Sequence, residues 1–296
     1  MYRPTRRVEG AHRDGIWAVY WSNDAIITGS LDGTAKLWKE DLSLIETTPE
    51  QRLGITSIVS LNNNQTVVSC CQDSIIRFHS MPSLKQYAEI DPGHLEAYSI
   101  SVSKTEDLIA AGSHTGNVHI WSVSNQEKLY ALKSSDDSKF FLSTDFNNDD
   151  TKLVAANMIG TVFLYDLATQ QIVHKIDAHG MPIRKVKFSK DGNLLYTASD
   201  DKHVSVFDTR NGSSINSFSH TGMSLTVDVS PDHRHFLVGC ADHTVVLWDL
   251  GMQRQEQLFE VQHTDQVWGV SYDETGNRFI SVGDDALLQL YERSTT

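Results

Sequence analysis

The sequence predicts an all-β protein folded as a seven-bladed β-propeller, and three observations support this prediction. First, an aromatic residue closes a short apolar segment seven times at nearly constant spacing: Trp38, Phe78, Trp121, Tyr165, Phe207, Trp248 and Tyr291. Second, a histidine precedes this aromatic residue by 26 to 28 positions in five of the seven periods. Third, no linker or low-complexity tract separates the periods, so we expect residues 1–296 to form a single domain.

The length of the period indicates the type of repeat. Successive aromatic residues are 40 to 44 positions apart. A period of about 40–45 residues is typical of WD repeats, in which each unit forms one four-stranded blade. Each blade can bury its faces only against its neighbours, so the repeats must close into a ring. The predicted fold is therefore a seven-bladed WD-repeat β-propeller.

The first repeat shows how one period becomes one blade. Trp17, Val19 and Trp21 recur at every second position, which is the period of an inner β-strand. The remaining elements follow in chain order: a turn at 22–24, a second strand at 25–29, a glycine-containing hairpin turn at 31–33, a third strand at 34–38 and a more polar fourth strand at 42–47. The same order recurs after His179 and after His263.

Two repeats are degenerate, and the last one lacks a strand. Arg52 stands where the second repeat should have its histidine, and the fourth repeat has only the polar stretch 134–139 there. Only five residues follow Tyr291, which leaves the seventh blade without an outer strand of its own. Residues 7–11 precede His12 as residues 175–178 precede His179. We therefore expect the N-terminal segment to close the last blade and cover its exposed edge.

The charge of the chain disfavours direct contact with nucleic acid. It carries 38 acidic and 25 basic side chains, a net charge of −13. Proteins that bind nucleic acid neutralise phosphates with a basic surface. The only small basic cluster here is Arg3, Arg6 and Arg7. Any role near RNA or chromatin should therefore depend on another protein.

Composition also bears on the cellular compartment. No run approaches the roughly 18 apolar residues of a membrane span, and the polar N-terminus does not resemble a signal peptide. The three cysteines, Cys70, Cys71 and Cys240, form no disulfide framework. We expect buried, reduced thiols in a protein of the cytoplasm and nucleus, with no membrane contact.

Residue types of a nucleophilic triad occur more than once. His263, Ser281 and Asp285 supply such a set, and His12, Thr28 and Asp32 nearly repeat it. A hydrolase would need one set beside an oxyanion hole. A set repeated at fixed offsets favours a structural hydrogen-bond network, completed in the first blade by the indole N–H of Trp38. The same network is predicted for His179, Asp201, His220, Asp242 and Trp248. We expect no catalytic residue.

Two further patterns suggest other functions. His233 and His235 are two residues apart and could offer metal ligands, but no cysteine or carboxylate joins them at ligand spacing, so a solvated turn is favoured. No glycine-rich phosphate loop opens a helix, so the sequence gives no support for nucleotide binding. We expect no metal, cofactor or small-molecule substrate. Residues 207–210, with Phe in place of Trp, resemble the WD-x-R motif of propellers that join cullin ubiquitin ligases. The alternative function is therefore a substrate receptor of such a ligase.

A partner should bind where the inner strands begin. The residues that open them form one predicted ring: Trp17, Ser57, Tyr98, Leu142, Arg184, Leu225 and Trp268. A second ring precedes each repeat aspartate or its replacement: Leu31, Gln72, His114, Met158, Asp200, Ala241 and Asp284. Aromatic residues near an arginine are typical of binding hot spots. We predict that partners bind Trp17, Tyr98, Arg184, Trp268, Asp200 and Asp284, and that ring closure places Trp17 beside Trp268.

Several stretches carry a more specific resemblance: residues 15–17, 28–32, 179–184, 197–201, 265–270 and 281–285. They resemble the WD-repeat subunit shared by the superkiller (Ski) complex and, in animals, the RNA-polymerase-associated (PAF) complex. The resemblance runs from the first blade to the last and includes the chain length. Blades two, three and six match least.

This resemblance implies a non-enzymatic scaffold. The family's subunit holds a tetratricopeptide-repeat subunit and a helicase together, and that assembly feeds mRNA 3′ ends to the cytoplasmic exosome for 3′–5′ decay. In the nucleus it is implied to accompany elongating polymerase through PAF complex subunits. Partner peptides are implied to dock on the channel rim, where the rings place Trp17, Tyr98, Arg184 and Trp268.

Overall fold

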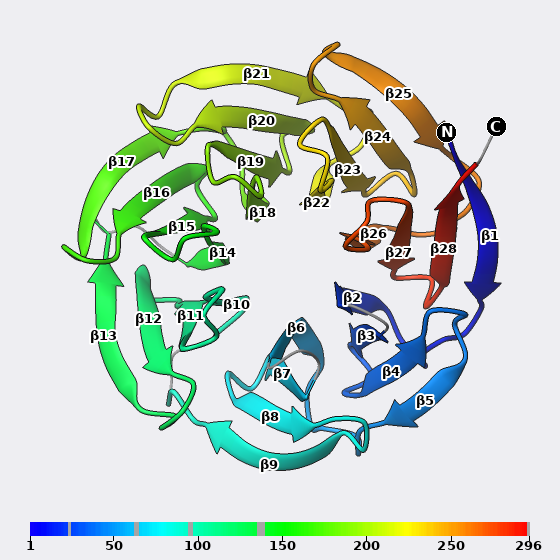
Figure 1. The fold of residues 1–296 in the computed structure, drawn as a ribbon, viewed down its shortest axis with the longest axis horizontal. Coiled ribbons are helices and arrows are strands. Elements are labelled where there is room, and N and C mark those ends of the chain that lie inside the picture. Colours follow the sequence, from blue (N-terminus) through cyan, green and yellow to red (C-terminus); the bar gives the residue numbers. More distant parts are fainter. Residues whose placement is uncertain (23–24, 62–64, 94–96, 135–139, 295–296) are drawn as a thin grey trace.

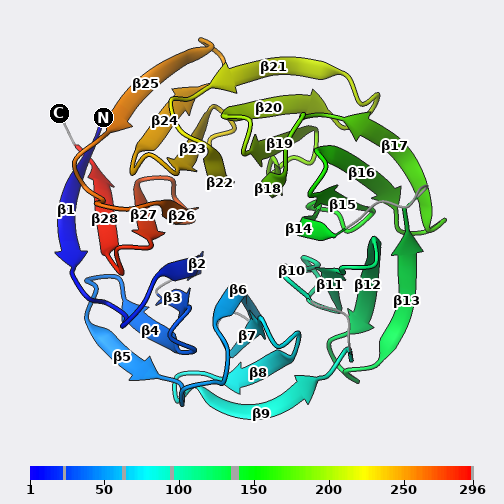
Figure 2. The same cartoon turned by 180° about the vertical axis from the view of Figure 1, so that it is seen from behind.

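Seven four-stranded antiparallel sheets surround a central channel (Figure 1; seen from behind in Figure 2). The computed structural model describes residues 1–22, 25–61, 65–93, 97–134 and 140–294. Within these ranges every regular element is a β-strand. The predicted all-β, seven-bladed propeller is therefore confirmed. None of the described segments forms a helix with the length and hydrophobicity that a bilayer crossing would demand.

The first four blades follow one another along the chain. Blade one contains β2 (Ile16–Ser22), β3 (Ala25–Ser30), β4 (Ala35–Lys39) and β5 (Leu44–Thr47). Blade two contains β6 (Ile55–Leu61), β7 (Thr66–Cys71), β8 (Ile76–Ser80) and β9 (Lys85–Ile90). Blade three contains β10 (Ile100–Val102), β11 (Leu108–Gly112), β12 (Asn117–Ser122) and β13 (Lys128–Lys133). Blade four contains β14 (Phe141–Phe146), β15 (Lys152–Asn157), β16 (Thr161–Asp166) and β17 (Gln171–Asp177).

The last three blades complete the circle. Blade five contains β18 (Ile183–Phe188), β19 (Leu194–Ser199), β20 (His203–Asp208) and β21 (Ser214–Ser219). Blade six contains β22 (Ser224–Val229), β23 (His235–Cys240), β24 (Val245–Asp249) and β25 (Arg254–Phe259). Blade seven contains β26 (Val267–Tyr272), β27 (Arg278–Gly283), β28 (Leu288–Arg293) and, from the other end of the chain, β1 (Tyr2–Val8).

The repeat aromatic residues lie in the third strand of every blade, as the period predicts. All seven lie in β4, β8, β12, β16, β20, β24 and β28. The second strands are buried along almost their whole length because neighbouring blades cover both of their faces. Ile27 and Leu37 of blade one, for example, share a core with Ile55 and Val67 of blade two. Burial between blades thus replaces a single central core.

Neighbouring inner strands are also joined by hydrogen bonds across the channel wall. Side-chain oxygens accept backbone N–H groups of the next blade: Ser143 from Val186 (3.1 Å), Asp145 from Phe188 (2.8 Å), Asp228 from Tyr272 (2.8 Å) and Ser271 from Trp21 (3.2 Å). The last of these pairs connects blade seven to blade one. These bonds fix the height of each blade relative to its neighbour, which positions the loops at the ends of the channel.

The N-terminal strand closes the ring, as predicted. β1 pairs antiparallel with β28, from Tyr2 opposite Arg293 to Val8 opposite Leu288. The strand covers 2–8 rather than 7–11, because the chain turns at Gly10, whose φ of 59° suits glycine. Figure 1 shows the N-terminal strand, in dark blue, along the outer edge of the red C-terminal strand.

Tyr2 anchors this closing strand on both sides. Its ring lies edge-on to Phe279 with centroids 5.1 Å apart, and its hydroxyl donates to the carbonyl of Gly276. The side-chain amide of Gln257, in β25, accepts the backbone N–H of Tyr2 at 2.9 Å and donates to its carbonyl at 2.7 Å. The first strand of the chain is therefore held by blade six as well as by blade seven.

Candidate functional site

The starts of the inner strands meet at one end of the central channel. A cavity of about 90 Å³ there is lined by all seven residues of the first predicted ring: Trp17, Ser57, Tyr98, Leu142, Arg184, Leu225 and Trp268. We call this end the mouth. A larger cavity of about 510 Å³ continues towards the opposite end and shares Lys185 with it. The seven residues of the first ring therefore converge at one end of the channel, and their role in binding partners stays a prediction.

The second predicted ring lies beside the first. Six of its members donate a backbone N–H to the loop that enters an inner strand: Leu31 to Gly15, Gln72 to Gly54, Met158 to Phe140, Asp200 to Pro182, Ala241 to Met223 and Asp284 to Gln266. The seventh, His114, packs its ring 5.0 Å from that of Phe140. The two rings thus share one rim, which is the geometry expected from the sequence.

A tryptophan pair marks the junction of blades one and seven. The rings of Trp17 and Trp268 stack with centroids 4.6 Å apart and an interplanar angle of 25°. Each indole N–H donates to the carboxylate of Asp284 at 2.8 Å, one to each oxygen. A Cβ on Gly15 would lie 2.5 Å from Oδ1 of Asp284, so glycine leaves the space for this carboxylate. One acidic side chain therefore fixes two half-buried aromatic rings.

Arg184 is fixed by a second aspartate of the same ring. Its Nε and Nη2 donate to the Asp200 carboxylate at 2.9 and 2.7 Å. Bidentate pairing of this kind sets the direction of the guanidinium group. The Tyr98 hydroxyl also interacts with Arg184, and the Tyr98 ring meets Phe140 edge-on at 5.6 Å. Asp200 is only 6 % exposed, so its role is to position Arg184 rather than to face a partner.

An apolar arc extends the mouth across blades four to six, and the sequence prediction missed most of it. Met158, Ile159, Met181 and Met223 are all exposed in the loops and turns of this rim. Methionine side chains adapt to varied apolar surfaces. Only Met158 was placed in a predicted ring. Apolar residues in otherwise polar turns were the signal that could have identified the rest.

The predicted histidine network is buried between the strands of individual blades. In blade one, His12 contacts Asp32 through Nδ1 (3.1 Å) and Thr28 through Nε2 (2.8 Å), and the Trp38 indole donates to Thr28 (2.9 Å). In blade five, His179 contacts Asp201 (2.8 Å) and Thr197 (2.7 Å) in the same way. Blade seven repeats the pattern with His263, Asp285 (3.0 Å) and Ser281 (2.6 Å).

Blade six differs from the predicted pattern at Asp242. The Trp248 indole donates directly to Nε2 of His220 at 2.9 Å, because Val238 occupies the position of Thr28. The Asp242 carboxylate accepts hydroxyl bonds from Thr221 and Thr244 rather than a bond from the His220 ring. His94 and residues 135–139 of the third and fourth repeats lie outside the described residues. Arg52, in the second repeat, is exposed.

These sets have the distances of a nucleophilic triad but none of its access. Ser281 and Thr28 are completely buried, and the side chains of His12, His179 and His263 are at most 1 % exposed. Burial lowers the pKa of His12 to about 4, so this ring is neutral at physiological pH. Three near-copies in one chain, sealed between strands, satisfy buried polar groups. The geometry supports the structural interpretation over a hydrolase.

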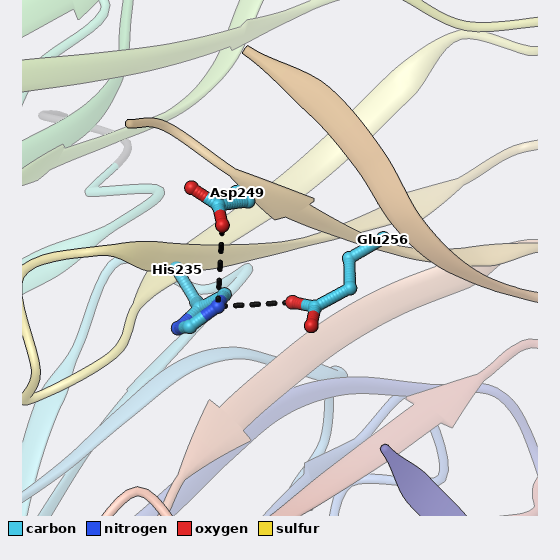
Figure 3. Close-up of side chains that lie close together, drawn as sticks. All are labelled: His235, Asp249 and Glu256. Carbon is cyan, nitrogen blue, oxygen red and sulfur yellow. Dashed lines mark ion pairs between the residues drawn. The ribbon is translucent and has the colours of Figure 1, made fainter. Parts of the chain in front are cut away.

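His235 does not lie in a solvated turn, which corrects the interpretation based on sequence. His233 does, with a φ of 58°, but His235 begins β23 and is buried. Figure 3 shows the His235 ring facing Asp249 and Glu256. These carboxylates lie on β24 and β25, so their sequence separation from His235 shows no ligand spacing.

Residues 207–210, which resemble the cullin-ligase motif, make local contacts within blade five. Arg210 is exposed, and its guanidinium pairs with the carboxylate of Asp208 at 2.5 Å. Thr209 is buried and donates to the carbonyl of Gly192. An aspartate two positions earlier therefore accounts for the orientation of this arginine, and the ligase alternative stays a prediction.

Comparison with known proteins decides the family. The WD domain, G-beta repeat matches residues 3–39, 212–249 and 255–292, and the Vps8 beta-propeller matches residues 74–224. The WD repeat-containing protein SL1-17 of Schistosoma mansoni is 33 % identical over 99 % of both chains. This chain is a WD-repeat protein. Propellers of this family generally act as non-catalytic scaffolds for protein interactions.

Two further relatives are less similar to this WD-repeat protein. The WD repeat-containing protein VIP3 of Arabidopsis thaliana is 31 % identical over 65 % of this chain and 66 % of its own. Human Striatin-4 is 24 % identical over 95 % of this chain, which corresponds to 42 % of Striatin-4. The chain thus matches proteins of its own length as well as part of a longer one.

Proposed function

We propose that this WD-repeat protein is a non-catalytic scaffold subunit that binds partner segments at its mouth. We further propose that its partners are the tetratricopeptide-repeat subunit and the helicase of the Ski complex in the cytoplasm, and PAF complex subunits in the nucleus. In this role it supports exosome-linked 3′–5′ mRNA decay and transcription elongation without touching RNA itself.

The observation that carries the scaffold role is the fixed arrangement at the mouth. Asp284 holds Trp17 and Trp268 in a stack, while Asp200 holds Arg184. Side chains held in their binding conformation lose little entropy when a partner arrives. Half-buried aromatic rings and an arginine beside exposed apolar residues are the composition of binding hot spots.

The choice of complexes is supported by the resemblance described above. Two of its segments, residues 179–184 and 265–270, are more specific than a generic WD signature. They contribute Arg184 and Trp268 to the lining of the mouth. The net charge of −13 fits a subunit that leaves RNA handling to the helicase and exosome.

A binding measurement with purified subunits tests this function. The wild-type protein should bind the tetratricopeptide-repeat subunit, and Trp268→Ala should weaken the complex by ~2 kcal/mol or more. Tyr87→Ala is the matched control, because Tyr87 is an exposed aromatic residue on the outer strand β9, away from the mouth. Equal affinity of a folded Trp268→Ala protein would exclude Trp268 from the binding site.

A further inference from the structure

A cluster of one histidine and two acidic side chains lies in blade six, at the end of the blade opposite the mouth. β22 starts at the mouth and β23 runs back towards it, so His235, the first residue of β23, lies at the far end. Asp249 ends β24, and Glu256 lies in the first half of β25. Three neighbouring strands of one sheet therefore each contribute a side chain to the same point.

The geometry of these side chains is that of a small ligand set. Nε2 of His235 lies 2.9 Å from Oε2 of Glu256 and 3.9 Å from Oδ2 of Asp249 (Figure 3). One ligand atom from each residue lies within 4.8 Å of the others. The side chains of His235 and Asp249 are 10 % and 1 % exposed, while that of Glu256 is 31 % exposed. Solvent therefore reaches the cluster from the Glu256 side.

Two outer contacts orient the inner groups. Nδ1 of His235 lies 2.6 Å from Oδ2 of Asp232, which turns Nε2 towards the cluster. Arg234 donates to Asp249 Oδ2 from Nε at 2.9 Å and from Nη2 at 2.6 Å. Metal-binding histidines commonly donate their other ring nitrogen to a carboxylate, and ligating carboxylates are themselves hydrogen-bonded.

The carboxylates of the cluster outnumber its guanidinium groups. Nε2 of His235 and Oε2 of Glu256 face each other at 2.9 Å, so both atoms are directed at the same point. The carboxylates of Asp232, Asp249 and Glu256 have one guanidinium partner, that of Arg234. A divalent ion at this point would balance the difference in charge between these three carboxylates and the single guanidinium.

We propose that this cluster is a site for a divalent transition metal, best suited to Zn²⁺. The ligands are Nε2 of His235, Oδ2 of Asp249 and a carboxylate oxygen of Glu256, with water in the fourth position. Metal binding at Oδ2 would displace one of the two Arg234 N–H donors, and the Arg234 side chain, 52 % exposed, has room to move away. Tetrahedral ligands about 2.1 Å from zinc are roughly 3.4 Å apart, between the two distances observed here. Rotation of the Glu256 side chain, which is 31 % exposed, accommodates the difference.

A metal ion here would stabilise the ring closure. It would tie β23, β24 and β25 together beside Gln257, whose side chain holds the backbone of Tyr2. The role is structural, because no reacting group other than the ligands and their partners lies in the set. This inference does not depend on the partners proposed for the mouth.

Calorimetric titration with Zn²⁺ tests the site. The protein is used without an affinity tag, after treatment with EDTA, and saturable binding of one ion per chain is expected. His235→Ala and Glu256→Gln should each weaken binding at least tenfold. His233→Ala and Glu260→Gln are matched controls on neighbouring residues and should retain the wild-type affinity. Glu256→Gln keeps the test decisive if His235→Ala fails to fold.

Thermal unfolding provides the second measurement. Zn²⁺ should raise the melting temperature of the wild type and of both controls clearly more than that of Glu256→Gln. Absence of saturable Zn²⁺ binding would overturn the proposal. Binding that both ligand variants retain, or that the controls lose equally, would also overturn it.

Discussion

Trp17 and Trp268 stack across the junction between the first and last blades of the propeller, with ring centroids 4.6 Å apart. The two residues come from opposite ends of the chain, and Asp284 binds both indole groups. Their stack therefore forms only when the ring closes. Closure of the fold and assembly of the mouth are thus one structural event.

The role of Asp284 in holding the stacked Trp17 and Trp268 rings can be tested by removing one of its two acceptor oxygens. In Asp284→Asn the amide keeps a single acceptor oxygen, so one indole N–H loses its partner. We expect the free energy of unfolding to fall by about 1 kcal/mol and the exciton-coupled circular dichroism of the stacked indoles to weaken. Asp265→Asn, at an exposed neighbouring position, is the control. An unchanged dichroism signal in Asp284→Asn would show that the stack of Trp17 and Trp268 does not need both hydrogen bonds to residue 284.

Deletion of the closing strand tests the role of the N-terminus. Removing residues 1–11 leaves the edge of β28 unpaired and takes away the Tyr2 ring that packs on Phe279. The melting temperature should fall clearly, whereas Arg3→Ala, at an exposed position in the same strand, should leave it nearly unchanged. An unchanged melting temperature after deletion would rule out this mode of closure.

The buried histidines predict how stability depends on pH. Burial lowers the pKa of His12 and of His220 from the ordinary 6.5 to about 4. Between these values the unfolded chain binds protons that the native protein excludes, so stability falls as pH drops from about 6.5 to about 4. Each histidine should contribute a loss of ~2 kcal/mol at pH 5, measurable as a lower urea midpoint than at pH 7. Equal midpoints would contradict the neutral, buried state of these rings.

The three cysteines should be inert in the native protein. Cys70, Cys71 and Cys240 are free and buried, and burial raises the pKa of the Cys71 and Cys240 thiols to about 12. A thiol-specific chromogenic disulfide should therefore react slowly with the folded protein and rapidly with all three thiols in denaturant. Fast reaction of a native thiol would mean that one of these cysteines is accessible.

Much of the fold could be predicted because a propeller repeats its environments. Each period places its aromatic residue in a third strand, and the first residues of the inner strands converge for geometric reasons. The positions of His12 and Trp38 within the first repeat therefore predict the equivalent positions in the other blades. The pairing of Trp17 with Trp268 needed only the additional expectation of a closed ring.

The contacts that could not be predicted are not specified by the position of a residue within the repeat. Asp242 bonds Thr221 and Thr244, which the period does not specify. The carboxylates around His235 come from two other strands, so no sequence spacing indicates them. The exposed methionines of the rim belong to turns, where the apolar period carries no information.

Quantitative affinity purification from the cells that express this protein tests the central claim most directly. Wild-type, Tyr87→Ala and Arg210→Ala proteins should each recover a tetratricopeptide-repeat protein and a helicase. Folded Trp268→Ala should recover roughly 30-fold less of both, which corresponds to the loss of ~2 kcal/mol expected at a hot spot. Equal recovery by Trp268→Ala, or reproducible failure of the wild type to recover either partner, would contradict the account.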